Sequence, residues 1–259
     1  MIPQAYITAW RNKAPWQEDF QVEQDLIIER ALIEIFNDPF LKERLAFRGG
    51  TALHKIYLSP AARYSEDIDL VQIKAEPFGL IIDRLRERLN FLGRAAVNQK
   101  QQNNTMVFKV DSETGIPLKI KVEVNCREHF TVYGIKETPF TLDSDWYKGK
   151  TAIPTYEIEE LLGTKLRALY QRRKGRDLFD LWYAMEKANA DPERILTAWS
   201  RYMKEEGHSI SQHDFIENME NKIIDKDFLG DMEGLLRSGI SYKIDNAYKF
   251  IKEELLVKI

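Results

Sequence analysis

Two aspartates one residue apart interrupt the apolar run DIDLVQI at residues 67–73. The alternation and the β-branched apolar residues predict a strand. Residues i and i+2 of a strand project from the same face, about 7 Å apart, so Asp67 and Asp69 point one way while Ile68 and Leu70 point to the core. Neighbouring carboxylates repel each other unless a cation lies between them. Two unpaired carboxylates this close would therefore cost the chain stability.

Magnesium is one cation that fits the aspartate pair. It prefers hard oxygen ligands and commonly takes one or two carboxylates together with phosphate oxygens. In a second interpretation the aspartates cap the next element, or pair with Arg63 and Lys55 on the surface. The motif is short enough to allow either interpretation, so other residues must decide between them.

A second candidate strand, LKIKVEVN at residues 118–125, carries another acid. Its β-branched residues share one face and its polar residues share the other. The polar set is Lys119, Lys121, Glu123 and Asn125. Glu123 would join Asp67 and Asp69 if the two strands are neighbours. Alternatively, the set forms the solvated polar face of an antiparallel sheet.

The glycine pair Gly49-Gly50 precedes a short helix that we expect to start near Thr51 and to close at Ser59-Pro60. A glycine turn before a helix exposes backbone N–H groups and a helix N-terminus, both of which suit phosphate oxygens. The hydroxyl of Thr51 would add a further polar group. The alternative is an ordinary glycine turn with Thr51 as the helix N-cap.

Secondary-structure patterns divide the chain into two parts. The first part alternates helical and strand periodicities, which predicts a mixed α/β domain over residues 1–155. Its expected helices and strands cover residues 17–36, 67–73, 78–93, 106–110 and 118–125. The second part is almost entirely helical in pattern and predicts a helical domain over residues 156–259, packed against the first.

Lys165 lies in the middle of an apolar helical stripe. The stripe comprises Ile158, Leu161, Leu162, Leu166 and Leu169. In one interpretation the lysine stem runs along this surface and its ammonium reaches water. In the other, the ammonium binds an anion in a cleft, where a compact point charge suits a triphosphate.

Charged residues follow this helix closely. The basic run is Arg172, Arg173, Lys174 and Arg176, which could bind a nucleic-acid backbone or simply solvate a helix end. Asp177 and Asp180 then share one face of the next helix. Asp177 suits the first turn of a helix because acids there complement the helix dipole, whereas Asp180 could serve a cleft between the two domains.

Composition limits the possible classes of protein. With 44% hydrophobic and 31% charged residues among 259, the chain is typical of a globular domain. Its net charge of −3 argues against a protein that coats nucleic acid, without excluding a local basic patch. The single cysteine, Cys126, excludes an intramolecular disulfide and a thiolate metal cage. Without an apolar membrane span or a signal sequence, we expect a cytoplasmic protein that does not bind membranes.

Taken in order, these motifs resemble the nucleotidyltransferase-like toxins of the AbiEii/AbiGii family, in the polymerase-beta-like nucleotidyltransferase superfamily. The matching segments are FRGGTALHKIYL, RYSEDIDL, KVEVN and LLGTKLRALYQRRKGRDLFDLW, and the resemblance covers most of residues 17–185. It implies a minimal mixed sheet flanked by helices, then a helical lobe, with a nucleoside triphosphate bound between them. It also implies magnesium, a cognate antitoxin, and transfer of a nucleotide to an acceptor, for which the 3′ end of tRNA is the first candidate.

The resemblance also implies roles for individual residues. The expected metal ligands are Asp67, Asp69 and Glu123. The expected nucleotide-binding residues are Gly49, Gly50, Thr51, Arg63, Ser65 and Lys165. Lys165 corresponds to the triphosphate lysine and Asp180 to the acid of the RDLFD motif, and both join the three carboxylates as expected catalytic residues. Thr51 replaces the serine of the general superfamily pattern. Two other functions stay open: transfer to a protein or small molecule, and a non-catalytic nucleotide-binding module on the same fold.

Overall fold

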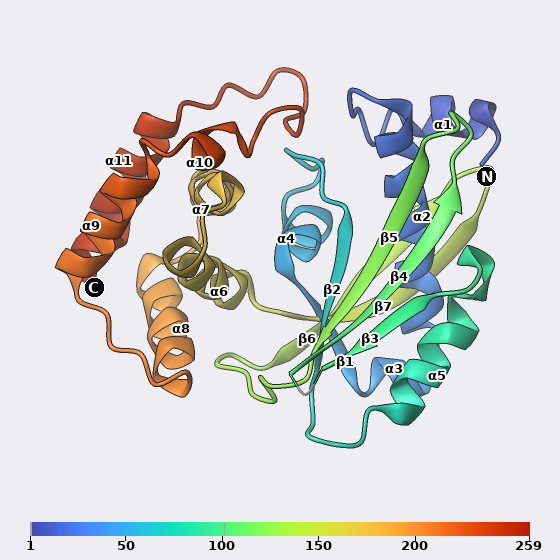
Figure 1. The fold of residues 1–259 in the computed structure, drawn as a ribbon, viewed down its shortest axis with the longest axis horizontal. Helices are drawn as coiled ribbons and strands as arrows, with labels where there is room; N and C mark the ends of the chain where they lie inside the picture. Colours follow the sequence, from blue (N-terminus) through green and yellow to red (C-terminus); the bar gives the residue numbers. More distant parts are fainter. Residues whose placement is uncertain (1, 101) are drawn as a thin grey trace. The chain divides into compact units, whose positions relative to one another are not determined.

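The computed structural model describes residues 2–100 and 102–259. The chain forms two compact units, and the boundary between them along the sequence lies between Tyr156 and Glu157 (Figure 1). The first unit contains a sheet with helices, and the second is helical. We describe each unit by itself.

A mixed seven-stranded sheet, in the order β3-β4-β5-β2-β1-β7-β6, forms the framework of the first unit. The strands are β1 (Leu45–Arg48), β2 (Asp67–Gln72), β3 (Ala96–Gln99), β4 (Asn103–Asp111), β5 (Pro117–Asn125), β6 (Ile135–Asp143) and β7 (Lys148–Tyr156). β2 pairs with β5, and β1 with β7, in parallel; the other neighbours are antiparallel. The mixed α/β class predicted from the sequence is therefore confirmed.

The hairpin of β6 and β7 was not predicted. The patterns assigned no strand beyond Asn125, whereas β7 extends to Tyr156 and includes the segment TAIPTY. Polar residues alternate only weakly with apolar ones there, because the first part of β7 is partly exposed and its last four residues are buried. A strand whose burial changes along its length lacks the period-2 signal that identifies other strands.

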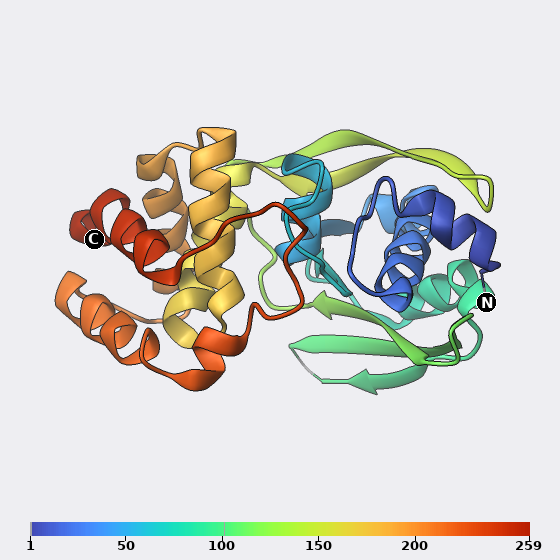
Figure 2. The same cartoon turned by 90° about the horizontal axis from the view of Figure 1, so that it is seen from above.

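Helices of the first unit pack along and around this sheet (Figures 1 and 2). They are α1 (Gln4–Trp10), α2 (Asp19–Phe36), α3 (Pro39–Lys42), α4 (Gly49–Ala52) with the π-helical turn Leu53–Tyr57, and α5 (Gly79–Arg88) with the 3-10 turn Asn90–Leu92. A capping box between Glu18 and Gln21 starts α2, two residues from its predicted beginning.

Alternating burial shows which face of the sheet packs on the core. On β5 the side chains of Ile120, Val122 and Val124 are buried, whereas the intervening polar residues are half-buried or exposed. On β2, Ile68 and Leu70 are buried in the same way between half-buried aspartates. The apolar face of each strand therefore drives its packing, and the polar face of both strands stays outside the core.

The second unit consists of helices. They are α6 (Ile158–Gln171), α7 (Gly175–Ala188), α8 (Pro192–Glu205), α9 (Gln212–Lys222), α10 (Lys226–Gly230) and α11 (Ile244–Glu254), with a last 3-10 turn Leu256–Lys258. α6 and α8 cross closely at Gly163, where a Cβ atom would lie 2.7 Å from Cβ of Ala198. Across residues 2–100 and 102–259, no helix is long and apolar enough to span a membrane.

A buried group of three charges ties the turn after α4 to α2. The ammonium of Lys55 lies 2.9 Å from Oδ2 of Asp25 and 2.7 Å from Oε1 of Glu29. Burial alone would lower the pKa of Lys55, but the two carboxylates outweigh it and raise this pKa. Trp10 donates a hydrogen bond to Asp25 and so adds α1 to the group. The predicted pairing of Lys55 with the aspartates of β2 is therefore wrong.

Replacing Lys55 tests this buried group. Lys55→Met should lower the free energy of unfolding by about 3 kcal/mol, because it leaves two carboxylates buried without their cation. Urea unfolding followed by circular dichroism measures the change. Lys42→Met removes a more exposed ion pair with Glu137 and should cost less than about 1 kcal/mol. Equal losses in the two variants would contradict the importance of the buried group.

Candidate active site

The parallel pairing of β2 with β5 brings three predicted carboxylates together. Asp67 lies opposite Lys121 and Asp69 lies opposite Glu123. Opposed residues of neighbouring strands project from the same face, so the three acids share the polar face of the sheet. Their side chains are partly exposed, 35% for Asp67 and 27% for Glu123. The antiparallel pairing of the alternative is wrong for β2 and β5, although β5 does pair antiparallel with β4.

Lys121 is the cation nearest to two of these carboxylates. Its ammonium lies 2.6 Å from Oε2 of Glu123 and 3.5 Å from Oδ2 of Asp67. Burial opposes the charge of Lys121, but the hydrogen bond to Glu123 and the charge of Asp67 hold its pKa above the usual value. Asn103 donates a further hydrogen bond, of 3.1 Å, to Glu123. Lys121 thus lies between Asp67 and Glu123, whereas the sequence predicted a cation between Asp67 and Asp69.

The pKa of Asp67 is raised, first because the carboxyl group is partly buried and then because Glu66 and Glu123 are near, although Lys121 opposes the shift. Arg63, expected on the surface, is instead 2% exposed, and it donates a hydrogen bond to the carbonyl of Tyr64 at 2.9 Å. Because its pKa is raised, the ionised form of Asp67 lowers the stability of the folded protein.

The glycine turn lies directly against the carboxylates. α4 begins at Gly49, two residues before the predicted start, with Arg48 as its N-cap. Gly49 has φ +78°, and a Cβ atom there would lie 2.1 Å from Oδ2 of Asp69. Only glycine combines this backbone conformation with so close an approach. The first N–H groups of a helix have no partner within the helix, so donors from this turn lie next to Asp69.

Thr51 is not the N-cap of its helix, as one interpretation of the sequence expected. It lies inside α4, fully buried. Its hydroxyl contacts the hydroxyl of Ser65 at 2.7 Å and donates to the backbone carbonyl of Asp67. Thr51 therefore fixes the glycine turn to the beginning of β2, and it brings Ser65 to the same place.

The donor set fits a magnesium ion in chemical type and in position along the strands. Asp67, Asp69 and Glu123 offer hard carboxylate oxygens from one face of two adjacent strands. In the described part of the chain, however, no group of three or more His, Cys, Asp or Glu side chains is arranged to hold a metal. The side chains of Asp67 and Glu123 are turned to Lys121 instead. A metal would have to take over these carboxylates from the lysine.

In the second unit, Lys165 belongs to a buried ion network between α6 and α7. Its ammonium lies 3.0 Å from Oδ1 of Asp177 and 2.9 Å from Oδ2 of Asp180, and its side chain is only 8% exposed. Arg172 donates two hydrogen bonds to Asp177, of 2.7 and 2.8 Å. Burial would raise the pKa of Asp177, but Lys165 and Arg172 together hold it below its usual range. The interpretation in which Lys165 reaches water is therefore wrong.

The basic run after α6 is paired with acids. Arg172 pairs with Asp177, and Arg173 with Asp225 at 3.1 Å. Lys174 and Arg176 both pair with Asp231, at 3.3 and 3.5 Å. These partners come from α7, from the residue before α10 and from the residue after it, which the sequence pattern could not assign. Each cation of the run therefore has an acidic partner within the second unit.

Lys121 and Asp177 are the residues whose importance the sequence did not indicate. Lys121 was placed on the polar face of its strand but received no role. Asp177 was explained by the helix dipole, although its main partners are Lys165 and Arg172. For Lys121, the i, i+2 spacing to Glu123 was a signal that the two side chains share one face of the strand. For Asp177, the only signal was its i, i+3 spacing to Asp180.

The sheet carries carboxylates on one face with a glycine turn against one of them, and comparison with known proteins identifies the family. The sequence matches the family described as nucleotidyl transferase AbiEii toxin, type IV TA system, over residues 30–249. The chain therefore belongs to this family of nucleotidyltransferase toxins from type IV toxin-antitoxin systems. The family implies a nucleotide substrate and a cognate antitoxin.

Two solved structures share the fold. The nucleotidyltransferase toxin MenT4 from Mycobacterium tuberculosis has a TM-score of 0.62 and 14% identity, with 100% of this chain and 91% of that chain covered. A protein from H. pylori described as a nucleotidyltransferase has a TM-score of 0.57 and 17% identity, with coverage of 93% and 99%. At these identities the likeness concerns the fold. No curated protein sequence matches.

The raised pKa of Asp67 predicts a pH-dependent effect of Asp67→Asn. Between the ordinary and the raised value the folded protein binds more protons than the unfolded chain, so stability falls as pH rises through this window. In metal-free buffer, Asp67→Asn should match the wild type in melting temperature near pH 4 and exceed it at pH 7. Melting curves across this range provide the measurement, and an Asn variant less stable at pH 7 would contradict it.

Gly49→Ala tests the contact between the glycine turn and Asp69. The added methyl group would meet the carboxylate, and the left-handed backbone adds strain, so we expect a loss of roughly 1–3 kcal/mol in unfolding free energy. Gly93→Ala is the matched control. It has a similar φ of +81° but open space around a Cβ atom, so it carries the strain without the collision. Equal losses would show that the approach to Asp69 is unimportant.

Proposed function

We propose that this protein transfers a nucleotide from a nucleoside triphosphate to the 3′ end of tRNA, with Mg²⁺ held by Asp67, Asp69 and Glu123. The observation that carries the proposal is the register of β2 and β5, which sets these carboxylates side by side next to the glycine turn. The family assignment supplies the reaction class. Magnesium bound there would neutralise phosphate charge and lower the pKa of the attacking hydroxyl.

In the proposed reaction the hydroxyl oxygen of the acceptor forms a bond to the α-phosphorus, and the bond from that phosphorus to pyrophosphate breaks. The hydroxyl proton leaves the acceptor, and pyrophosphate leaves as an anion. Gly49 and Gly50 donate backbone N–H groups to phosphate oxygens. Thr51 and Ser65 hold the turn against β2, and Arg63, from the loop before that strand, completes the proposed nucleotide-binding set.

Lys165 has a proposed role in charge compensation. An ammonium has three N–H donors, and Asp177 and Asp180 lie within reach of two of them. The remaining donor can offset charge that develops on the leaving pyrophosphate. Asp180 then acts by orienting the ammonium.

A transfer assay tests this proposal. Purified protein, Mg²⁺ and total tRNA are incubated with each labelled nucleoside triphosphate in turn. We expect label on tRNA with one or more nucleotides, and a loss of at least about a hundredfold in Asp67→Asn, because one metal ligand is lost. Label on RNA at an unchanged rate in this variant would exclude the metal role of Asp67.

The controls separate chemistry from folding. Asp143→Asn removes an exposed acid paired with Lys148 and should retain wild-type transfer. Mg²⁺ should raise the melting temperature of the wild type but not of Asp67→Asn, which reports metal binding without catalysis. If triphosphate is consumed without label on tRNA, the acceptor is a protein or a small molecule. If no triphosphate is consumed with any acceptor, the protein is a binding module.

A further inference from the structure

Two lysines face each other on the polar side of the sheet, beyond the carboxylates. Lys119 on β5 lies opposite Lys109 on β4, and both are exposed. Cβ atoms of opposed residues lie about 5 Å apart, and like charges in such positions destabilise a strand pair. Within residues 2–100 and 102–259, neither lysine has a carboxylate within ion-pair distance. The sheet therefore carries a repulsive pair that its own acids leave uncompensated.

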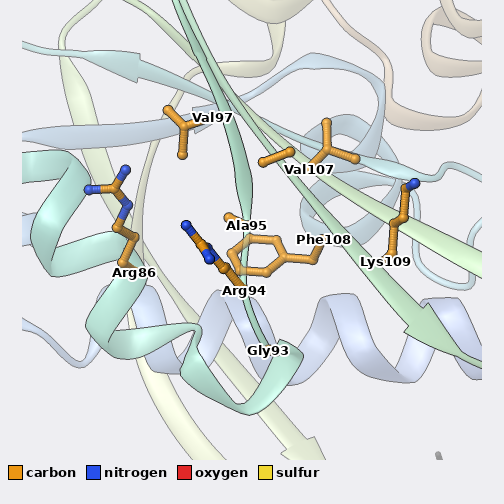
Figure 3. A pocket seen from close by; sticks show the side chains of 9 residues that line it. Arg86, Gly93, Arg94, Ala95, Val97, Val107, Phe108 and Lys109 are labelled. Atoms are coloured by element: carbon orange, nitrogen blue, oxygen red, sulfur yellow. The ribbon is translucent and has the colours of Figure 1, made fainter.

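The positive charge continues from this pair to the edge of the sheet. Arg94 lies just before the edge strand β3, and it lines a groove together with Lys109 (Figure 3). The groove has a volume of about 1050 Å³. Its other lining residues are Arg86, Gly93, Ala95, Ala96, Val97, Val107 and Phe108. It thus combines cationic side chains with small and apolar ones, and it contains no acid.

Lys119, Lys109 and Arg94 form what we call the cationic strip. It starts two residues along β5 from Lys121, the lysine that lies between the carboxylates, and ends in the groove. The nearest acid on the same face of β4 is Asp111, at the end of the strand away from the carboxylates. Because the whole chain has a net charge of −3, this accumulation of positive charge is local.

We infer that the cationic strip binds the phosphate backbone of a single-stranded RNA end and leads it to the carboxylates. Lysine ammonium groups in a row suit successive phosphates, and an arginine adds a fork for one of them. The apolar walls of the groove suit ribose and base surfaces, as in other single-strand channels. The inference rests on the proposed function, because it assigns the acceptor of that reaction to a surface.

The test uses the full-length double variant Lys109→Gln/Lys119→Gln. Binding of a fluorescent total-tRNA preparation is measured by anisotropy at several salt concentrations. We expect at least about tenfold weaker binding near physiological salt, and a salt slope lower by about 1–2, because two phosphate contacts are lost. Triphosphate affinity should stay unchanged. The melting temperature should not fall, since the substitutions remove a repulsive pair.

The matched control is Lys74→Gln/Lys150→Gln, which removes the same charge from two exposed lysines at other positions of the first unit. An equal loss of RNA affinity in this control would overturn the inference, since the effect would then follow net charge alone. Unchanged RNA affinity in the strip variant would also overturn it. If that variant instead loses binding to poly-glutamate, the face suits an acidic protein.

The two experiments distinguish a wrong inference about the cationic strip from a wrong proposed function. If tRNA is labelled at the wild-type rate by the strip variant, transfer stands and the strip is excluded. If no RNA is labelled but the strip variant still loses RNA binding, RNA binding by the strip stands, and transfer to RNA is excluded. If the wild-type protein binds no RNA, the strip inference is wrong, and transfer can still be tested with other acceptors.

Discussion

The pairing of β2 with β5 is the interaction on which the candidate site depends. These strands are distant in sequence, and their parallel register places Asp69 opposite Glu123 and Asp67 opposite Lys121. A shift by one residue would turn every one of these side chains to the opposite face. The buried Ile68, Leu70, Val122 and Val124 prevent such a shift, since it would expose them. The apolar side of the two strands therefore determines the geometry of the polar side.

Several residues of the candidate site and of the cationic strip have unusual local environments. Burial raises the pKa of Asp67, Gly49 holds a left-handed conformation against Asp69, and Lys109 faces Lys119 without a counter-ion. The environment of Asp67 and the facing lysines are unfavourable for folding alone, whereas glycine adopts its conformation without a steric penalty. Natural proteins commonly violate local rules at functional sites and are stabilised elsewhere. Here the buried group around Lys55 and the apolar core provide that stability.

The second unit uses charge in a different way. Lys165, Arg172, Asp177 and Asp180 form a buried network in which each charge has an opposite partner. Breaking one member would leave a buried charge uncompensated, so the network holds α6 and α7 in one arrangement. The basic run that follows α6 is likewise paired with acids near α10. The residues of the basic run therefore have acidic partners within the second unit, in contrast to Lys109 and Lys119 of the cationic strip.

The sequence by itself determined the fold class, the strands of the two acidic motifs and the longer helices that it located, because these depend on periodicity over short segments. It also placed Asp67, Asp69 and Glu123 on polar faces, and Lys165 on a buried stripe. Only the tertiary structure decided which residues meet: Lys121 with Asp67, Lys55 with Asp25 and Glu29, Lys165 with Asp177, and Gly49 with Asp69. These contacts depend on strand order and helix packing, which bring distant residues together and leave no periodic signal in the chain.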